Sequence, residues 1–204
     1  MTPWWYYFGG IVVLCVIVSG CTSTTPQSST AAMPAPDTPP VTAPAISKVP
    51  GTGAFFLEAA GLGAGEALPA AYTCTGAGES PEIRWTGIPA DTKSLVLILD
   101  DPDAPSGTFT HWIVYNIPSE TRELARAQPL AKTLANGAQQ GDSSAGSRGY
   151  FPPCPPVGQQ HRYVFRLYAL DGGISMPTTD RAGIDTAMSG HIIEKTEAVM
   201  TFRR

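Results

Sequence analysis

Five polar side chains have the types and spacing of a small anion-binding site: Asp101, Asp103, His111, His161 and Tyr163. A proline follows each aspartate within two residues, which restricts the backbone that carries the two carboxylates. His161 and Tyr163 share one face of a strand because side chains alternate along it. A carboxylate can orient an imidazole, and imidazole and phenol groups can donate hydrogen bonds to an anion. The sequence therefore predicts a phosphate-binding pocket formed by these side chains.

Each of these residue types also has an ordinary structural role. An aspartate before proline often only forms a turn, and a histidine in a strand is often a hydrogen-bonded core residue. The chain contains no GxSxG or HExxH motif and no Cys and His spacing typical of a zinc site. We therefore expect neither catalysis nor a bound metal or other cofactor.

Four segments with the patterns of β-strands are expected to position the site. Residues 94–100 form a near-continuous apolar run, typical of a central strand buried on both faces. Residues 111–117 and 161–170 are rich in β-branched and aromatic residues, and turn-forming residues follow each of them. Residues 54–57 begin the patterned part of the chain. These segments predict a mainly β domain.

One segment near the C-terminus has helical spacing. Apolar residues recur every four positions from Ile184 to Ile192, and Asp180 precedes them as a potential N-cap. We expect a helix that runs to about residue 197, followed by a short strand over residues 198–202.

The composition limits the classes of partner. The net charge is −4 and the sequence has no run of Lys and Arg, so nucleic acid is not an expected partner. Gly and Pro together make up about a fifth of the chain, which favours strands joined by loops.

Residues 118–160 lack a clear apolar period, and so long an irregular stretch is usually functional or flexible. Cys74 and Cys154 form either one disulfide or two separate buried thiols.

The first 52 residues are expected to lie outside the domain. Residues 1–20 contain an apolar run after a group of aromatic residues, and the small residues before Cys21 resemble a lipobox, in which the cysteine is lipidated. Residues 21–52 are rich in Ser, Thr, Pro and Ala and predict a flexible tether to a domain at residues 53–204. Three interpretations remain open: a lipoprotein, an uncleaved signal anchor and a secreted soluble protein. Each places the domain outside the cytoplasm, and the first two attach it to the cell membrane.

The segment DPDAPSGTFTHWIVYNIP, residues 101–118, resembles the signature of the phosphatidylethanolamine-binding protein family in its bacterial and archaeal Raf-kinase-inhibitor-like branch. Further motifs resemble the family in the same order, at residues 72–74, 80–81, 85–89, 154–156, 158–163 and 188–192. The resemblance covers residues 54–204. Thr75 and Glu82 depart from the family pattern near the expected rim of the pocket.

The resemblance implies a large central antiparallel sheet packed on a smaller sheet, with a few peripheral helices and a shallow pocket at one end. By motif, the pocket would be lined by Asp101, Asp103, His111, Pro156, His161 and Tyr163. Arg162, paired to a carboxylate, and Trp112 would support it. The leading function is binding of a small anion or phospholipid head group without turnover. The alternative is an inhibitor of, or adaptor for, a protein partner such as a protease or kinase.

Overall fold

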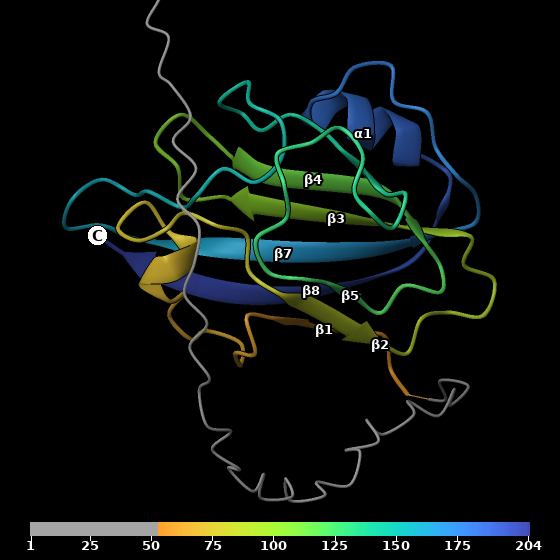
Figure 1. Ribbon diagram of the computed structural model, residues 1–204, viewed down its shortest axis with the longest axis horizontal. Helices are drawn as coiled ribbons and strands as arrows, with labels where there is room; N and C mark the ends of the chain where they lie inside the picture. The colour runs from red at the N-terminus through yellow and green to blue at the C-terminus, as the bar shows by residue number, and fades with distance from the viewer. Residues whose placement is uncertain (1–52) are drawn as a thin grey trace, which may run out of the picture. The chain divides into compact units, whose positions relative to one another are not determined.

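Two antiparallel sheets form the core of residues 53–204, the part of the chain that the computed structural model describes (Figure 1). The larger sheet has the order β6-β4-β3-β7-β8, with β3 (Ser94–Asp101), β4 (Phe109–Pro118), β6 (Gln139–Gln140), β7 (Gln160–Leu170) and β8 (Ile192–Arg203). The smaller sheet has the order β1-β2-β5, with β1 (Phe56–Ala59), β2 (Ile83–Thr86) and β5 (Glu123–Leu124). The predicted mainly β architecture of a large sheet packed on a smaller one is confirmed.

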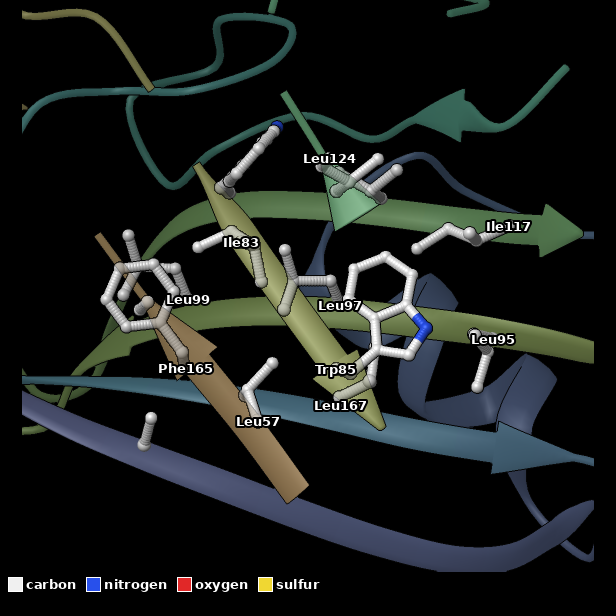
Figure 2. Packing of buried hydrophobic residues seen from close by; sticks show 14 of the residues in the cluster. Leu57, Ile83, Trp85, Leu95, Leu97, Leu99, Ile117, Leu124, Phe165 and Leu167 are labelled. Carbon is white, nitrogen blue, oxygen red and sulfur yellow. The ribbon is translucent and has the colours of Figure 1, made fainter. Parts of the chain in front are cut away.

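Strand β3 lies at the centre of the larger sheet and is buried along its whole length, as its apolar run predicted. Leu95, Leu97 and Leu99 face the smaller sheet, and Figure 2 shows them close to Ile83 and Trp85 of β2. The alternate side chains of β3 pack on the opposite face in a second apolar cluster, beside helix α1 (Arg181–Met188). Burial of each such side chain contributes roughly 2 kcal/mol to folding, so the core holds β3 rigidly where it ends at Asp101.

The C-terminal helix is shorter than predicted. The side chain of Asp180 accepts a hydrogen bond from the backbone N–H of Gly183 at 3.0 Å and caps the start of α1. The helix ends at Met188, and Gly190 has a φ of 80°, in the left-handed region that glycine adopts without strain. The chain then forms β8, which pairs with β7 from Ile192 to Arg203. The predicted helix to residue 197 and the strand limited to residues 198–202 are therefore wrong.

The cause of this error is one apolar residue. Ile192 continues the four-residue spacing of the helix, but it lies in β8 and is 46% exposed. Its neighbour Ile193 is also β-branched, and such residues favour a strand. Besides α1, the described part of the chain has one short 3₁₀ turn, η1 (Ala70–Tyr72).

The irregular stretch after β4 lies along the larger sheet and is held there by the backbone. The N–H of Phe151 donates to the carbonyl oxygen of His111 at 2.8 Å. Three residues later, Cys154 is joined to Cys74 in a disulfide, with their Cα atoms 5.4 Å apart. The backbone N–H of Cys74 also donates to the carbonyl of Pro153 at 3.0 Å. These bonds fix a proline-rich segment beside the start of β4.

In residues 53–204, no helix has the length and hydropathy needed to cross a membrane. The predicted signal or anchor at residues 1–20, the lipidation at Cys21 and the tether at residues 21–52 lie outside the described residues.

Candidate ligand-binding pocket

A cavity of about 220 Å³ lies at one end of the larger sheet, where β3 ends and where β4 and β7 begin. Its lining comprises Asp101, Ala104, Pro105, Phe109, His111, Phe151, Cys154, Pro155, Pro156 and His161. The structure thus brings four of the six predicted lining residues together: Asp101, His111, Pro156 and His161. It places the other two, Asp103 and Tyr163, outside the lining.

Asp101 orients the ring of His161. Nδ1 of His161 lies 2.7 Å from Oδ2 of Asp101, and both side chains are almost fully buried. The other carboxylate oxygen accepts the backbone N–H of Asp103 at 2.9 Å. A carboxylate is an acceptor, so Nδ1 of His161 carries the hydrogen. The second ring nitrogen lies 3.2 Å from Oε1 of Gln159.

His111 is oriented by a backbone carbonyl. Its Nδ1 lies 2.8 Å from the carbonyl oxygen of Phe151, which can only accept, so Nδ1 donates here too. Burial lowers the pKa of His111 below its ordinary value, against the opposing effects of the Phe151 carbonyl and of the Asp101 charge. The ring lies 4.7 Å from that of Phe109 and meets Tyr163 edge-on at 5.4 Å between centroids. A neutral imidazole packed among aromatic rings results.

Asp103 pairs with Arg162 instead of lining the cavity. Its Oδ1 lies 2.6 Å from one terminal nitrogen of Arg162, and its Oδ2 accepts from Nε at 2.9 Å and from the backbone N–H at 2.8 Å. These hydrogen bonds lower the pKa of Asp103 to about 2. The pairing of Arg162 with a carboxylate is as predicted, and it anchors the turn after β3 to β7.

Tyr163 lies behind the pocket rather than in its wall. It is fully buried, and its hydroxyl is one of two buried side-chain polar atoms in residues 53–204 without a hydrogen-bond partner. Burial raises the pKa of this phenol, so it stays neutral. Trp112 is also buried, on the side of β4 that faces the core, where its Nε1 donates to Oε1 of Gln140 at 2.8 Å. Tyr163 packs against the ring of His111, whereas Trp112 packs edge-on against Tyr150 in the core, and its supporting role stays a prediction.

Sequence reasoning missed the apolar walls. Phe109 and Phe151 lie with their ring centroids 5.7 Å apart and, together with Pro105 and Pro155, give the cavity an apolar surface. These side chains carry no titratable or charged group, so their residue types alone do not indicate a binding site. The cluster of prolines around residue 154 was the available signal, because it marks a rigid segment within an otherwise irregular stretch.

The two departures from the family pattern lie outside the lining of the cavity. Thr75 is hydrogen-bonded to Thr73 at 2.9 Å, and Glu82 forms a salt bridge with Arg84 on the surface of the smaller sheet. Thr75 is next to Cys74, whose disulfide partner Cys154 lines the cavity, so the expectation of a change near the rim stays a prediction.

A larger hollow of about 510 Å³ lies at the start of α1, bounded in part by Asp142, Asp180 and Arg181. Asp142 is paired with Arg148, and Asp180 caps the helix. Arg181 bonds to Asp100 and Asp185. Because its charged groups already have protein partners, this hollow is a weaker candidate than the cavity with the two histidines.

Two packed sheets with a small cavity at one end of the larger sheet define a ligand-binding β protein. The family model described as "Phosphatidylethanolamine-binding protein" matches residues 60–203. The chain therefore belongs to the phosphatidylethanolamine-binding protein (PEBP) family, as its motifs predicted.

Relatives and solved structures agree with this assignment. A UPF0098 protein of Methanothermobacter thermautotrophicus is 44% identical over 138 residues, which are 67% of this chain and 91% of the relative. A UPF0098 protein of Aquifex aeolicus is 44% identical over 143 residues, or 69% and 83% of the two chains. These similarities place the chain in the bacterial and archaeal branch of the family.

Crystal structures show the same fold. The PEBP homologue CT736 from Chlamydia trachomatis matches with a TM-score of 0.67 and 37% identity, over 74% of this chain and 97% of that chain. Escherichia coli YbcL, a member of the mammalian PEBP family, matches with a TM-score of 0.68 and 28% identity, over 74% and 98%.

Proposed function

We propose that the domain binds a small anion or a phosphorylated head group in the 220 Å³ cavity without turning it over. The observation that carries this proposal is that two imidazoles and the carboxylate of Asp101 line one cavity with otherwise mostly apolar walls. Such a site recognises a ligand by a few placed polar groups in an apolar surround. Membrane attachment through a lipid on Cys21 or through a signal anchor belongs to the same proposal, and would place the pocket outside the cytoplasm.

The volume of the cavity limits the size of the group that can bind in it. About 220 Å³ accommodates a phosphate-sized group with a short substituent, so the pocket would hold the head group of a larger molecule and leave the remainder outside. Few contacts are then available, and we expect a dissociation constant of ~1 mM, equivalent to about 4 kcal/mol.

The proposal is tested by NMR titration with inorganic phosphate and with phosphoethanolamine. Resonances of His111 and His161 should shift with saturation in the millimolar range. The His161→Ala variant should lose the response, whereas His191→Ala should keep it, because His191 is exposed and pairs with Asp171. Unchanged resonances of both pocket histidines at tens of millimolar ligand would contradict anion binding.

A second candidate is an inhibitor of, or adaptor for, a protein partner. Leu130 and Val157 favour it, since they are apolar, 68% and 78% exposed, and lie in or beside the irregular stretch that borders the pocket. A protease or another surface protein would be the target outside the cytoplasm. Binding of such a partner should weaken when both residues are changed to Asp, and binding that is unaffected would count against this surface.

A further inference from the structure

The hydrogen-bond roles of His111 are determined by its surroundings. A carbonyl oxygen has no hydrogen to give, so the 2.8 Å contact with Phe151 requires the hydrogen of the neutral ring to be on Nδ1. Nε2 then carries a lone pair. Within residues 53–204 this nitrogen has no hydrogen-bond partner, although His111 lines the cavity. In its neutral form, His111 can only accept a hydrogen bond from a ligand.

His161 is less restricted. Its Nδ1 donates to Asp101, and its Nε2 is 3.2 Å from the side-chain amide of Gln159. An amide can present either its oxygen or its NH₂ group after a flip, so Gln159 is compatible with a protonated or an unprotonated Nε2. With a hydrogen on both ring nitrogens and the Gln159 amide turned away from Nε2, His161 would donate to an anion while Asp101 balances its charge.

Burial lowers the pKa of His111, and His161 adds to this effect, whereas the carboxylates of Asp101 and Asp100 oppose it. Asp101 and His161 lie beside it in the lining, and the neutral phenol of Tyr163 lies against its ring. Behind them, the buried carboxylate of Asp100 is paired with two arginines.

Two arginines lie near the rim, and one of them is held by a carboxylate. Arg162 is held by Asp103. Arg204 has a terminal nitrogen 3.4 Å from Sγ of Cys154, at the edge of the cavity, where it can attract an anion without protonating the histidine.

An oxygen atom without a hydrogen would face the lone pair of His111 at close range. Two acceptors facing each other in an apolar cavity lose the hydrogen bonds that both make to water, at a cost that is a sizeable fraction of the binding free energy expected here. A ligand oxygen that carries a hydrogen avoids this cost and donates to Nε2.

We infer that His111 accepts a hydrogen bond from the ligand, so that the pocket selects acids that can bring an O–H together with a negative charge: inorganic phosphate and phosphomonoesters in preference to phosphodiesters. This inference rests on the proposed anion binding and specifies the ligand class of that site. A singly protonated phosphomonoester matches both histidines, with its O–H towards His111 and a charged oxygen towards His161. A phosphodiester has no O–H to offer and must instead add a proton to His111.

The test compares methyl phosphate with dimethyl phosphate by isothermal titration calorimetry, using the full-length chain in a nonionic detergent. A phosphomonoester loses its second proton near pH 6. At pH 6 we expect methyl phosphate to bind at least about tenfold more tightly than dimethyl phosphate. Between pH 7 and pH 8 its affinity should fall at least about tenfold, with uptake of one proton by the phosphate and of up to one more by His161, measured from the binding heats in buffers of different ionisation enthalpy.

His111→Gln provides the matched variant, because glutamine offers an NH₂ donor in the region of Nε2. In this variant the preference for methyl phosphate should fall to less than about threefold, while His191→Gln should behave as the wild type. If the variant does not fold, the comparison of methyl phosphate with dimethyl phosphate on the wild-type chain tests the inference by itself. Equal affinities for the two phosphates at pH 6 would overturn the inference and leave the proposed function standing. Absence of binding by both at tens of millimolar would overturn both.

Discussion

Asp101 and His161 lie 60 residues apart in the sequence, yet the carboxylate of one is 2.7 Å from the ring of the other. The contact joins the end of β3 to the start of β7, the two strands that pair along the centre of the larger sheet. It also leaves Nε2, which lies 3.2 Å from Oε1 of Gln159, as the ring nitrogen of His161 that a ligand would have to reach. The pairing of the central strands therefore determines the orientation of His161.

Changing Asp101 to Ala should destabilise the domain. The substitution leaves Nδ1–H of His161 buried without a partner, and such a loss costs about 1–3 kcal/mol in free energy of unfolding. Urea denaturation followed by circular dichroism measures it. Asp171→Ala removes a similar contact to His191 at the exposed surface and should have no measurable effect. Equal losses in the two variants would contradict the distinction between buried and exposed pairs.

The pair of Asp103 and Arg162 should make stability depend on pH in the acid range. The pKa of Asp103 falls from 3.8 to about 2 on folding, so the unfolded chain takes up the proton first. The stabilisation is complete above pH 4 and is lost as the pH falls from about 4 to about 2. Arg162→Gln should therefore lower the urea midpoint at pH 5.5 but have little effect at pH 2.

A matched control exists for this comparison. Arg122 donates to the backbone carbonyls of Ser119 and Thr121, which do not titrate. Any effect of Arg122→Gln on the urea midpoint should be the same at both pH values. If the effect of Arg162→Gln also stayed constant, the pair would not be the source of the pH dependence.

Asp100 should be among the most sensitive polar residues in the domain. It is 1% exposed, accepts from Thr110 at 2.8 Å and receives Arg166 and Arg181 on one carboxylate oxygen at 2.9 and 2.7 Å. Asp100→Ala leaves the two arginines without this partner and should cost roughly 3 kcal/mol, at the low end for a buried pair because both arginines remain partly exposed.

The control for this cluster is Asp185→Ala, which removes only the exposed partner of Arg181. Its effect on the free energy of unfolding should be less than about 0.5 kcal/mol. A small loss for Asp100→Ala would mean that the cluster adds little to the attachment of α1 to the sheet.

The packing between the sheets predicts a large effect of Leu97→Ala. Leu97 is fully buried in the middle of β3, among side chains of both sheets (Figure 2). Its truncation should leave a cavity and cost about 3 kcal/mol. Val157→Ala, at a position 78% exposed, should leave the thermal midpoint unchanged. Comparable shifts for the two variants would contradict the observed core.

Local patterns were sufficient to predict the central strands. The apolar run of residues 94–100 and the β-branched segments around it have few other ways to bury their side chains, and they form β3, β4 and β7. The end of α1 could not be read in this way. Whether Ile192 continues the helix or begins a strand depends on pairing with β7, which is a contact between distant segments that the spacing of residues does not report.

The candidate site was predictable in its polar part only. Residue types and turn-forming prolines singled out Asp101, His111 and His161 as candidates, and the resemblance to the family implied that they line one pocket, where the structure places all three. The position of Phe151 depends on a backbone hydrogen bond to His111 across a loop, and no local pattern indicates such a bond. The family motif implied that Asp103 lines the pocket and that Arg162 pairs with a carboxylate, but sequence alone could not show that this carboxylate is Asp103 itself.

The disulfide between Cys74 and Cys154 makes one wall of the cavity depend on the redox state of two cysteines. One of the bonded cysteines lies in the cavity wall, and its partner is 80 residues earlier in the chain. Where thiols are kept reduced, this wall would be held by its backbone hydrogen bonds alone. The covalent part of the wall is therefore suited to an oxidising environment, in which such a bond persists.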